Sequence, residues 1–431
     1  MTKAVLLLGG SAQQLDSFEA ARRLGYRTVL CDWDPNCPGR ELADSFYEVS
    51  TIDREAVLRV ARAESVDGVV SYASDASAPV AAWVSERLGL PGNPCESVAM
   101  LCDKGRFRAF LAENGFAVPD NVVANSGDRS AAKSAAQMIG LPLVVKPVDS
   151  AGSRGVSVVR DFSELVAAFN RACEFSRKGE VVMESYIETA TAGRVIEAEL
   201  FVEGGKIISW GLMSAYRDLS LNGVVPSCYI HPMDECSRVN ASVHEVLSAL
   251  VARAGIVQGA MNIELIANKS GDIYIIDVGP RNGGNYLPRF FSYISGDDIV
   301  EATLRIAVGD PSGLKHFEQS KDGLWVQFMH YAQTSGIFNG FEFTKEYEGA
   351  HVETHLYKEL GSHVEPLESI SDSIGVSLCI FRAKAILELF LRDFLLCVAP
   401  KFIDDLKGVV IQEGAGEVRS CRLGSPNGRT P

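Results

Sequence analysis

This chain of 431 residues lacks the features that mark several large classes of protein. Its ten cysteines form no CxxC pair, and several lie in apolar stretches such as VLCDW and SLCIF, as reduced thiols do in a cytoplasmic protein without a disulfide framework or a zinc site. No segment approaches the ~18 uncharged apolar residues of a membrane span. The formal net charge of −14 argues against a nucleic-acid backbone as a partner. These absences leave a cytoplasmic globular protein, for which a small anionic ligand such as a nucleotide remains open.

Two common nucleotide-binding motifs are missing as well. The turn after the first predicted strand reads GGSAQQ, without the GxGxxG spacing that lets a backbone approach a dinucleotide. The loop SAGSRGV at 150–156 does not follow the GxxxxGK(S/T) pattern, which excludes P-loop chemistry. A nucleotide site in this chain must therefore be built in another way.

What the chain does contain is an α/β pattern long enough for more than one core, since single cores stop growing near roughly 250–300 residues. Residues 1–96 alternate strands and helices, which predicts a Rossmann-like parallel sheet. Residues 97–310 read as a central α+β domain, with a lid at about 140–190. Residues 311–431 read as a smaller, β-rich α+β region with a mobile Gly/Ser/Arg/Pro-rich tail.

A lysine and a glycine-rich loop form the first feature that points to chemistry. Lys146 stands inside the apolar strand VVKPV, where an ammonium is costly unless it meets an anion. The loop that follows contains Ser150, Gly152, Ser153 and Gly155, small residues that let backbone N–H groups close around phosphate oxygens. The alternative is a β-hairpin turn with an exposed lysine.

The second feature is a carboxylate at the end of an apolar strand. Glu184 interrupts the strand VVMESYI just before Tyr186 and Ile187, a segment that can offer a carboxylate and backbone groups to an adenine edge. An edge strand with one glutamate would look the same.

Glu264 and Asp277 lie on two strands joined by the short turn NKSGD, so both carboxylates can point to one side. Carboxylates beside a nucleotide suit Mg²⁺, which prefers carboxylate, phosphate and water oxygens. Arg281 follows at once, and a guanidinium there can stabilise charge on a transferring phosphoryl group. A surface hairpin with a salt bridge would explain one acid and the arginine, but not the apolar run around both acids.

The chain resembles the ATP-grasp superfamily in the order of these features. That order is a strand lysine, a glycine loop, a hinge glutamate, two acids, an arginine and Gly-Gly. The resemblance is strongest to its carboxylate–amine ligases, including members like the carbamoyl-phosphate-synthase large chain and the L-amino acid ligases. It covers roughly residues 1–310 and extends more loosely to GSHVEPLESISDSIGVSLCIF. The implied architecture is a Rossmann-like pre-ATP-grasp domain, an ATP-grasp domain with its lid, and a small β-rich C-terminal region.

The resemblance also implies roles for individual residues. Lys104, which carries no signal of its own, would hold ATP phosphates together with Lys146, and the loop from Ser150 to Gly155 would close over them. Glu184 with the backbone at Tyr186 and Ile187 would bind adenine, Glu199 would lie near the nucleotide, Glu264 and Asp277 would bind Mg²⁺, and Arg281 would steady an acyl phosphate.

The implied reaction joins a carboxylate to an amine with ATP and Mg²⁺. A carboxyphosphate or carbamate reaction is the first alternative, and a nucleotide-binding protein that has lost catalysis is the second. Gly279 supports the second, because the family pattern is an acid, any residue, then Asn-Pro-Arg, whereas this chain reads Asp277-Val-Gly-Pro-Arg. Losing the asparagine oxygen puts occupancy by two metals in question; the missing ligand must come from water or from another residue, for which Asn282 is a nearby candidate.

The substrate side is less defined by sequence. The segment SYASDAS at 71–77 ends a strand of the first domain, where open α/β sheets place ligands. Candidates for contacting a small-molecule carboxylate or amine are Arg217, His231, Asn285 and Tyr286. The identity of both substrates and the oligomeric state stay open, although homodimers are common among proteins of this kind.

Overall fold

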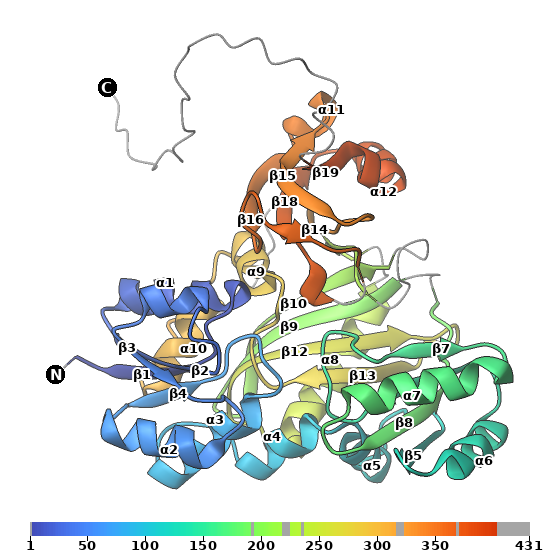
Figure 1. Ribbon diagram of the computed structural model, residues 1–431, viewed down its shortest axis with the longest axis horizontal. Coiled ribbons are helices and arrows are strands. Elements are labelled where there is room, and N and C mark those ends of the chain that lie inside the picture. Colours follow the sequence, from blue (N-terminus) through green and yellow to red (C-terminus); the bar gives the residue numbers. More distant parts are fainter. Residues whose placement is uncertain are drawn as a thin grey trace.

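The computed structural model describes residues 2–190, 194–217, 225–233, 237–315, 323–367 and 370–402. The tail expected to be mobile lies outside these residues. Figure 1 shows the N-terminal domain in blue and the lid in teal on opposite sides of the middle of the molecule, with the C-terminal strands in orange and red above them.

The N-terminal sheet has the strand order β3-β2-β1-β4, with β1 at Ala4–Leu8, β2 at Arg27–Asp32, β3 at Ser45–Glu48 and β4 at Gly68–Val70. Its strand pairs are parallel, which confirms the predicted sheet. Every residue of β1 is buried, so helices must cover both faces. The helices α1 (Leu15–Leu24) and α10 (Ile299–Ala307) pack on one face, and α2 (Arg54–Ala63) and α3 (Ala78–Leu88) pack on the other.

A long antiparallel sheet forms the centre of the molecule, with the order β13-β12-β9-β10-β11-β14-β18-β16. The helices α4 (Cys95–Leu101), α5 (Lys104–Glu113) and α8 (Ser237–Ala254) lie beside it, and apolar residues of α5 and α8 share one core with β9, β12 and β13. The sheet continues past residue 310, so the C-terminal region shares it with the domain before it. Its strands are β9 (Arg194–Glu203), β10 (Lys206–Tyr216), β11 (Cys228–His231), β12 (Gln258–Ala267), β13 (Ile273–Gly279), β14 (Leu324–His330), β16 (His351–Leu356) and β18 (Gly375–Phe381).

The segment predicted as a lid at about 140–190 belongs to a small antiparallel sheet that is backed by two helices and begins earlier, at residue 121. We call this whole unit the lid. Its strand order is β5-β8-β6-β7, and the apolar faces of α6 (Arg129–Ile139) and α7 (Leu165–Phe175) pack against it. Its strands are β5 (Asn121–Asn125), β6 (Leu143–Pro147), β7 (Ser157–Val159) and β8 (Glu180–Ser185). β6 and β7 pair antiparallel, with the expected glycine loop between them.

The C-terminal region adds a second, smaller sheet of order β17-β15-β19. The segment with the histidines at 351 and 355 forms β16. The remaining elements are β15 (Gly336–Phe343), β17 (His363–Val364), β19 (Val398–Phe402), α9 (Leu287–Ser295), α11 (Lys345–Glu348), α12 (Lys384–Cys397) and the 3-10 turns Ala12–Gln14, Pro38–Leu42, Phe162–Glu164 and Ile370–Asp372.

Within the described residues, no helix is both long enough and apolar enough to cross a membrane. The cysteines described there, such as Cys31 and Cys379, carry free thiols.

Candidate functional site

One cavity of about 1550 Å³ lies where the regions of the molecule meet. Its walls come from the N-terminal domain (Asp75), the lid (Lys146), the central sheet (Glu264) and the C-terminal region (Tyr357 and Ile370). Small-molecule pockets usually measure roughly 300–1,000 Å³, so the space is sufficient for more than one ligand.

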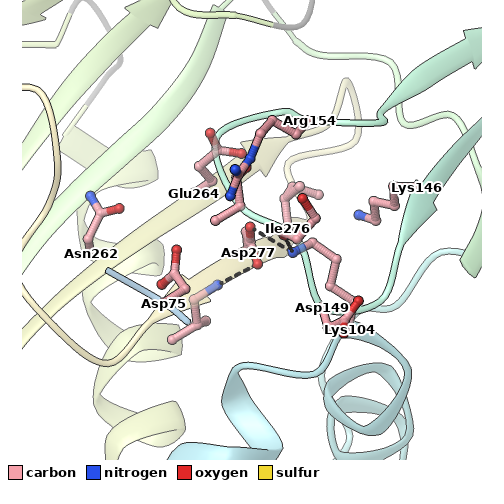
Figure 2. Close-up of polar contacts among 12 residues, drawn as sticks. Asp75, Lys104, Lys146, Asp149, Arg154, Asn262, Glu264, Ile276 and Asp277 are labelled. Atoms are coloured by element: carbon pink, nitrogen blue, oxygen red, sulfur yellow. Dashed lines mark hydrogen bonds and ion pairs between the residues drawn. The ribbon is translucent and has the colours of Figure 1, made fainter. Parts of the chain in front are cut away.

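Acidic residues form a row across the floor of this cavity. In the strand register, Glu264 on β12 lies opposite Glu197 on β9 and opposite Asp277 on β13. Because side chains two residues apart point to the same face of a strand, the next row on that face holds Glu199, Asn262 and Gly279. Figure 2 shows Asn262, Glu264 and Asp277 together in this part of the site.

Lys104 reaches Asp277 from the start of α5. The helix begins at this residue because the side chain of Asp103 accepts a hydrogen bond from the Arg106 backbone N–H. The ammonium lies 3.2 Å from Asp277 and donates to the Ser150 carbonyl at 2.9 Å (Figure 2). Burial opposes its charge, but Asp277 and then Asp75 offset this effect and raise the pKa of Lys104.

Lys146 enters the cavity wall from β6 and pairs with the carboxylate of Glu184. The other Glu184 oxygen accepts from Arg108 Nε at 2.9 Å, and all three side chains are buried. Although burial alone would raise it, Arg108 and Lys146 lower the pKa of Glu184 to about 2. Burial lowers the pKa of Lys146 to about 8. Glu184 therefore orients two cations, and its carboxylate is not free for the adenine edge that the sequence suggests.

Tyr186 and Ile187 follow Glu184 and line the cavity. The Tyr186 N–H already donates to the Pro142 carbonyl at 3.1 Å. Its carbonyl, rather than its N–H, is thus the group that Tyr186 can present to a purine.

The glycine loop closes one side of the cavity. Gly152 and Gly155 have φ angles of 66° and 75°, which residues with a Cβ rarely adopt. Ser150, Gly152 and Ser153 all line the cavity, and Arg154 points into it from the same loop (Figure 2). A Cβ at position 152 would lie 2.7 Å from Ile370, so the C-terminal region packs directly against this loop.

Arg281 is held on two sides. Its Nη2 donates to Asp75 at 2.6 Å, and its Nη1 donates to the Asn262 side chain at 3.1 Å. Asn262 is itself oriented by Glu197 at 2.5 Å and Glu199 at 2.7 Å. The guanidinium folds across Gly279, where an added Cβ would lie 2.4 Å from its central carbon. Glycine in place of the expected asparagine thus makes room for the arginine.

Glu199 lies beneath the cavity rather than on its wall. It is fully buried, accepts from the Gly283 N–H at 3.4 Å, and burial raises its pKa to about 8. Its neighbour Glu197 faces the cavity instead. The role of Glu199 beside the nucleotide stays a prediction.

The candidates for substrate contacts divide into two groups. Arg217 lines the cavity with its Nη2 3.3 Å from Glu264, and Asn285 lines it near Gln13 of the N-terminal domain. His231 and Tyr286 are not brought to the described cavity, which corrects the sequence expectation. The His231 ring bonds to the Leu212 carbonyl at 2.9 Å, and Tyr286 stacks on His355 with ring centres 4.3 Å apart.

Several residues of the site were not predicted from the sequence, although the spacing of some of them is informative. Arg108 lies one helical turn after Lys104, so both point the same way from α5. Asn262 precedes Glu264 by two residues and Glu197 precedes Glu199 by two, which places each pair on one face of its strand. Asp75 lies in the flagged segment 71–77, but nothing local links it to Arg281.

Comparisons with known proteins agree with this arrangement. A model described as the ATP-grasp domain matches residues 139–288, and an ATP-grasp N-terminal domain model matches residues 18–92.

Curated relatives include the carbamoyl phosphate synthase large chains of Vibrio cholerae (25% identical over 295 residues) and Corynebacterium glutamicum (28% identical over 295 residues). Each alignment covers 67% of this chain and 26% of the relative, so the chain matches about a quarter of their length.

Among solved structures, the L-amino acid ligase of Bacillus licheniformis superimposes with a TM-score of 0.75 at 21% identity, over 93% of this chain and 99% of that one. Phosphoribosylglycinamide synthetase from Anaerococcus prevotii gives 0.72 at 19% identity, over 93% and 100%. At these identities, the likeness shows a common fold.

Proposed function

Because the chain belongs to the ATP-grasp superfamily, we propose that it is an ADP-forming ligase that joins a carboxylate to an amine. In this proposal, ATP phosphorylates the carboxylate to an acyl phosphate, and the amine then displaces phosphate to give an amide. The substrates are small molecules.

The observation that carries the proposal is the convergence of charge on one cavity. Lys104 from α5 and Lys146 from the lid supply ammonium groups for phosphate oxygens, and Arg281 supplies a guanidinium beside Asn262, in the row next to the acids. Phosphoryl transfer needs positioning and charge stabilisation more than covalent help from the protein, and this set of groups provides both.

The donor set at the acid row fits Mg²⁺. Glu264 and Asp277 lie opposite each other on adjacent strands, and both line the cavity. The described residues hold no cluster of three or more His, Cys, Asp or Glu side chains suited to a metal ion. Two carboxylates with phosphate and water oxygens are the ligands Mg²⁺ commonly takes, so Glu264 and Asp277 would hold it. When bound, the ion would neutralise charge on the transferring phosphoryl group.

The chain's own groups would perform the remaining tasks. Lys146, oriented by Glu184, would bind phosphate oxygens beside the glycine loop. Lys104, at the start of α5, would bind phosphate oxygens from the side of Asp277. Arg281 would stabilise the oxyanion that forms when the amine attacks the acyl phosphate. The loop at 150–155 and Ile370 beside it would exclude water, which otherwise hydrolyses the acyl phosphate.

A second candidate uses bicarbonate as the carboxylate and passes through carboxyphosphate. It is favoured by the curated relatives, which are carbamoyl phosphate synthase large chains. The residues in the cavity would play the same parts, because bicarbonate, like a carboxylate, has an oxygen anion that accepts the phosphoryl group.

The experiment is ATP turnover by the purified protein with Mg²⁺, against pooled amino acids, small carboxylates and bicarbonate, with products identified by mass. A product one water lighter than the sum of its two parents, together with ADP and phosphate, is expected. AMP and pyrophosphate would overturn phosphoryl transfer, and ATP binding without any turnover would favour a regulatory protein that has lost catalysis.

A further inference from the structure

Asp75 and Arg281 are 206 residues apart in the chain, yet they form a partly buried ion pair at the junction of two domains. We infer that Asp75 is a positioning residue that fixes the Arg281 guanidinium at the reaction centre, and that glycine at position 279 is required for this placement. The inference rests on the proposed function, in which Arg281 acts on the reacting group.

The pair leaves Arg281 little freedom. Its side chain is 12% exposed, and its guanidinium is bonded to Asp75 on one side and to Asn262 and the Asn282 carbonyl on the other. Asn262 is oriented in turn by two glutamates. A planar guanidinium bonded along two edges cannot rotate without breaking charge-assisted hydrogen bonds.

Gly279 supplies the space that this conformation occupies. A Cβ there would lie 2.4 Å from Arg281 Cζ, 2.7 Å from its Nη2 and 2.7 Å from Asp75 Oδ1. These atoms are the two partners of the ion pair itself. Any side chain at position 279 would therefore require these atoms to shift from their present positions.

Asp75 lies in a loop whose conformation is fixed by internal hydrogen bonds. It follows β4 in a turn in which Ala73 has a φ of 53°, and the Ser71 hydroxyl donates to the Ser74 carbonyl at 2.7 Å and contacts the Ser77 hydroxyl at 2.7 Å. A non-glycine residue at positive φ costs roughly 1–3 kcal/mol and persists only where its surroundings impose it. The loop at the carboxyl end of a parallel strand thus places one carboxylate accurately.

In the part of the chain that the structure describes, the pair leaves buried polar atoms without hydrogen-bond partners, which a contact with only a structural role would not need to do. Within the described residues, Asp75 Oδ1 and Arg281 Nε are buried atoms without a hydrogen-bond partner. Both residues line the cavity. Unpaired buried polar atoms are costly, and their position beside the cavity is consistent with partners supplied by a ligand.

Kinetics test the positioning role. In Asp75→Asn, kcat for product formation should fall on the order of 10–100-fold while KM for ATP stays within about two-fold, because the arginine loses its alignment but the nucleotide contacts remain. The matched control is Asp310→Asn, which removes another ion pair with the N-terminal domain, to Lys3 at 2.6 Å, away from the cavity. It should leave kcat unchanged. Equal kcat for Asp75→Asn and wild type, or an equal fall in both variants, would overturn the role.

A second measurement needs no activity. Urea midpoints are compared for Asp75→Asn, Gly279→Ala and the double variant. If both substitutions act by separating the same ion pair, the double variant should unfold at the midpoint of the less stable single variant. If the shifts of the two single variants add in the double variant, Gly279 does not act by leaving space for the ion pair. If wild type forms no product with any substrate, the proposed function fails, and the catalytic half of this inference fails with it, whereas the urea midpoints still decide the pairing.

Discussion

Lys146 and Glu184 form an ion pair inside the lid, and each side chain is only 5% exposed. Arg108 from α5 bonds to the same carboxylate, so the pair also ties the lid to the central domain. Removing one partner from a buried pair leaves an uncompensated charge, which costs far more than the pair contributes.

Glu184→Gln should therefore destabilise the lid by about 3 kcal/mol, because Lys146 and Arg108 lose their shared counter-charge. Hydrogen exchange at lid amides measures this local opening. Glu188→Gln is the matched control, since Glu188 pairs with Lys269 on the surface. It should leave exchange unchanged, and equal effects of both substitutions would contradict the account.

The pH dependence of nucleotide binding should report on Lys146. A lysine is charged below its pKa, and the pKa of Lys146 is about 8. ATP should therefore bind more weakly as pH rises from 7 to 9, as the ammonium loses its proton. Lys146→Arg should remove this decline, because a guanidinium stays protonated. Titration calorimetry measures the ATP affinity of wild type and of Lys146→Arg at each pH. Identical pH profiles of the two proteins would exclude Lys146 as the source of the pH dependence.

Asp277→Asn should lower turnover by about 100-fold or more, because the Mg²⁺ ion that would neutralise charge on the transferring phosphoryl group loses a carboxylate ligand. The Mg²⁺ concentration for half-maximal activity should rise in parallel. Asp272→Asn, in the exposed turn of the same hairpin, should change neither quantity. An unchanged Mg²⁺ requirement in Asp277→Asn would reject Asp277 as a ligand.

The contact between the glycine loop and the C-terminal region can be tested with a pair of glycines. Gly152 and Gly140 both have positive φ, at 66° and 85°, but a Cβ would meet Ile370 at 2.7 Å only in the first case, with nothing within 4 Å in the second. Gly152→Ala should lower turnover more than Gly140→Ala does. Ile370→Ala should restore part of the loss. No difference between the glycine variants would mean that the contact does not matter for closure.

Much of this architecture could be predicted because its signals are local. The strand that carries Lys146, the glycine loop and the hairpin of Glu264 and Asp277 each occupy one short segment. Their order along the chain is the basis of the resemblance to the ATP-grasp superfamily.

The roles that could not be predicted depend on partners far away in the chain. Glu184 looks like an adenine ligand until Arg108, 76 residues earlier, is brought to its carboxylate. Gly279 looks like a lost metal ligand until the arginine two residues later folds across it to reach Asp75. His231 lies near the site in sequence, yet the pairing of β10 and β11 brings its ring to Leu212 instead.

In the proposed reaction, the carboxylate is activated by direct phosphorylation. The most direct test uses the carboxylate substrate with both oxygens labelled with ¹⁸O, followed by mass analysis of the released phosphate. If an acyl phosphate forms, amine attack breaks the bond between the acyl carbon and the bridging oxygen, so each phosphate should carry one ¹⁸O and each amide should keep the other. Product formed with unlabelled phosphate would contradict the account.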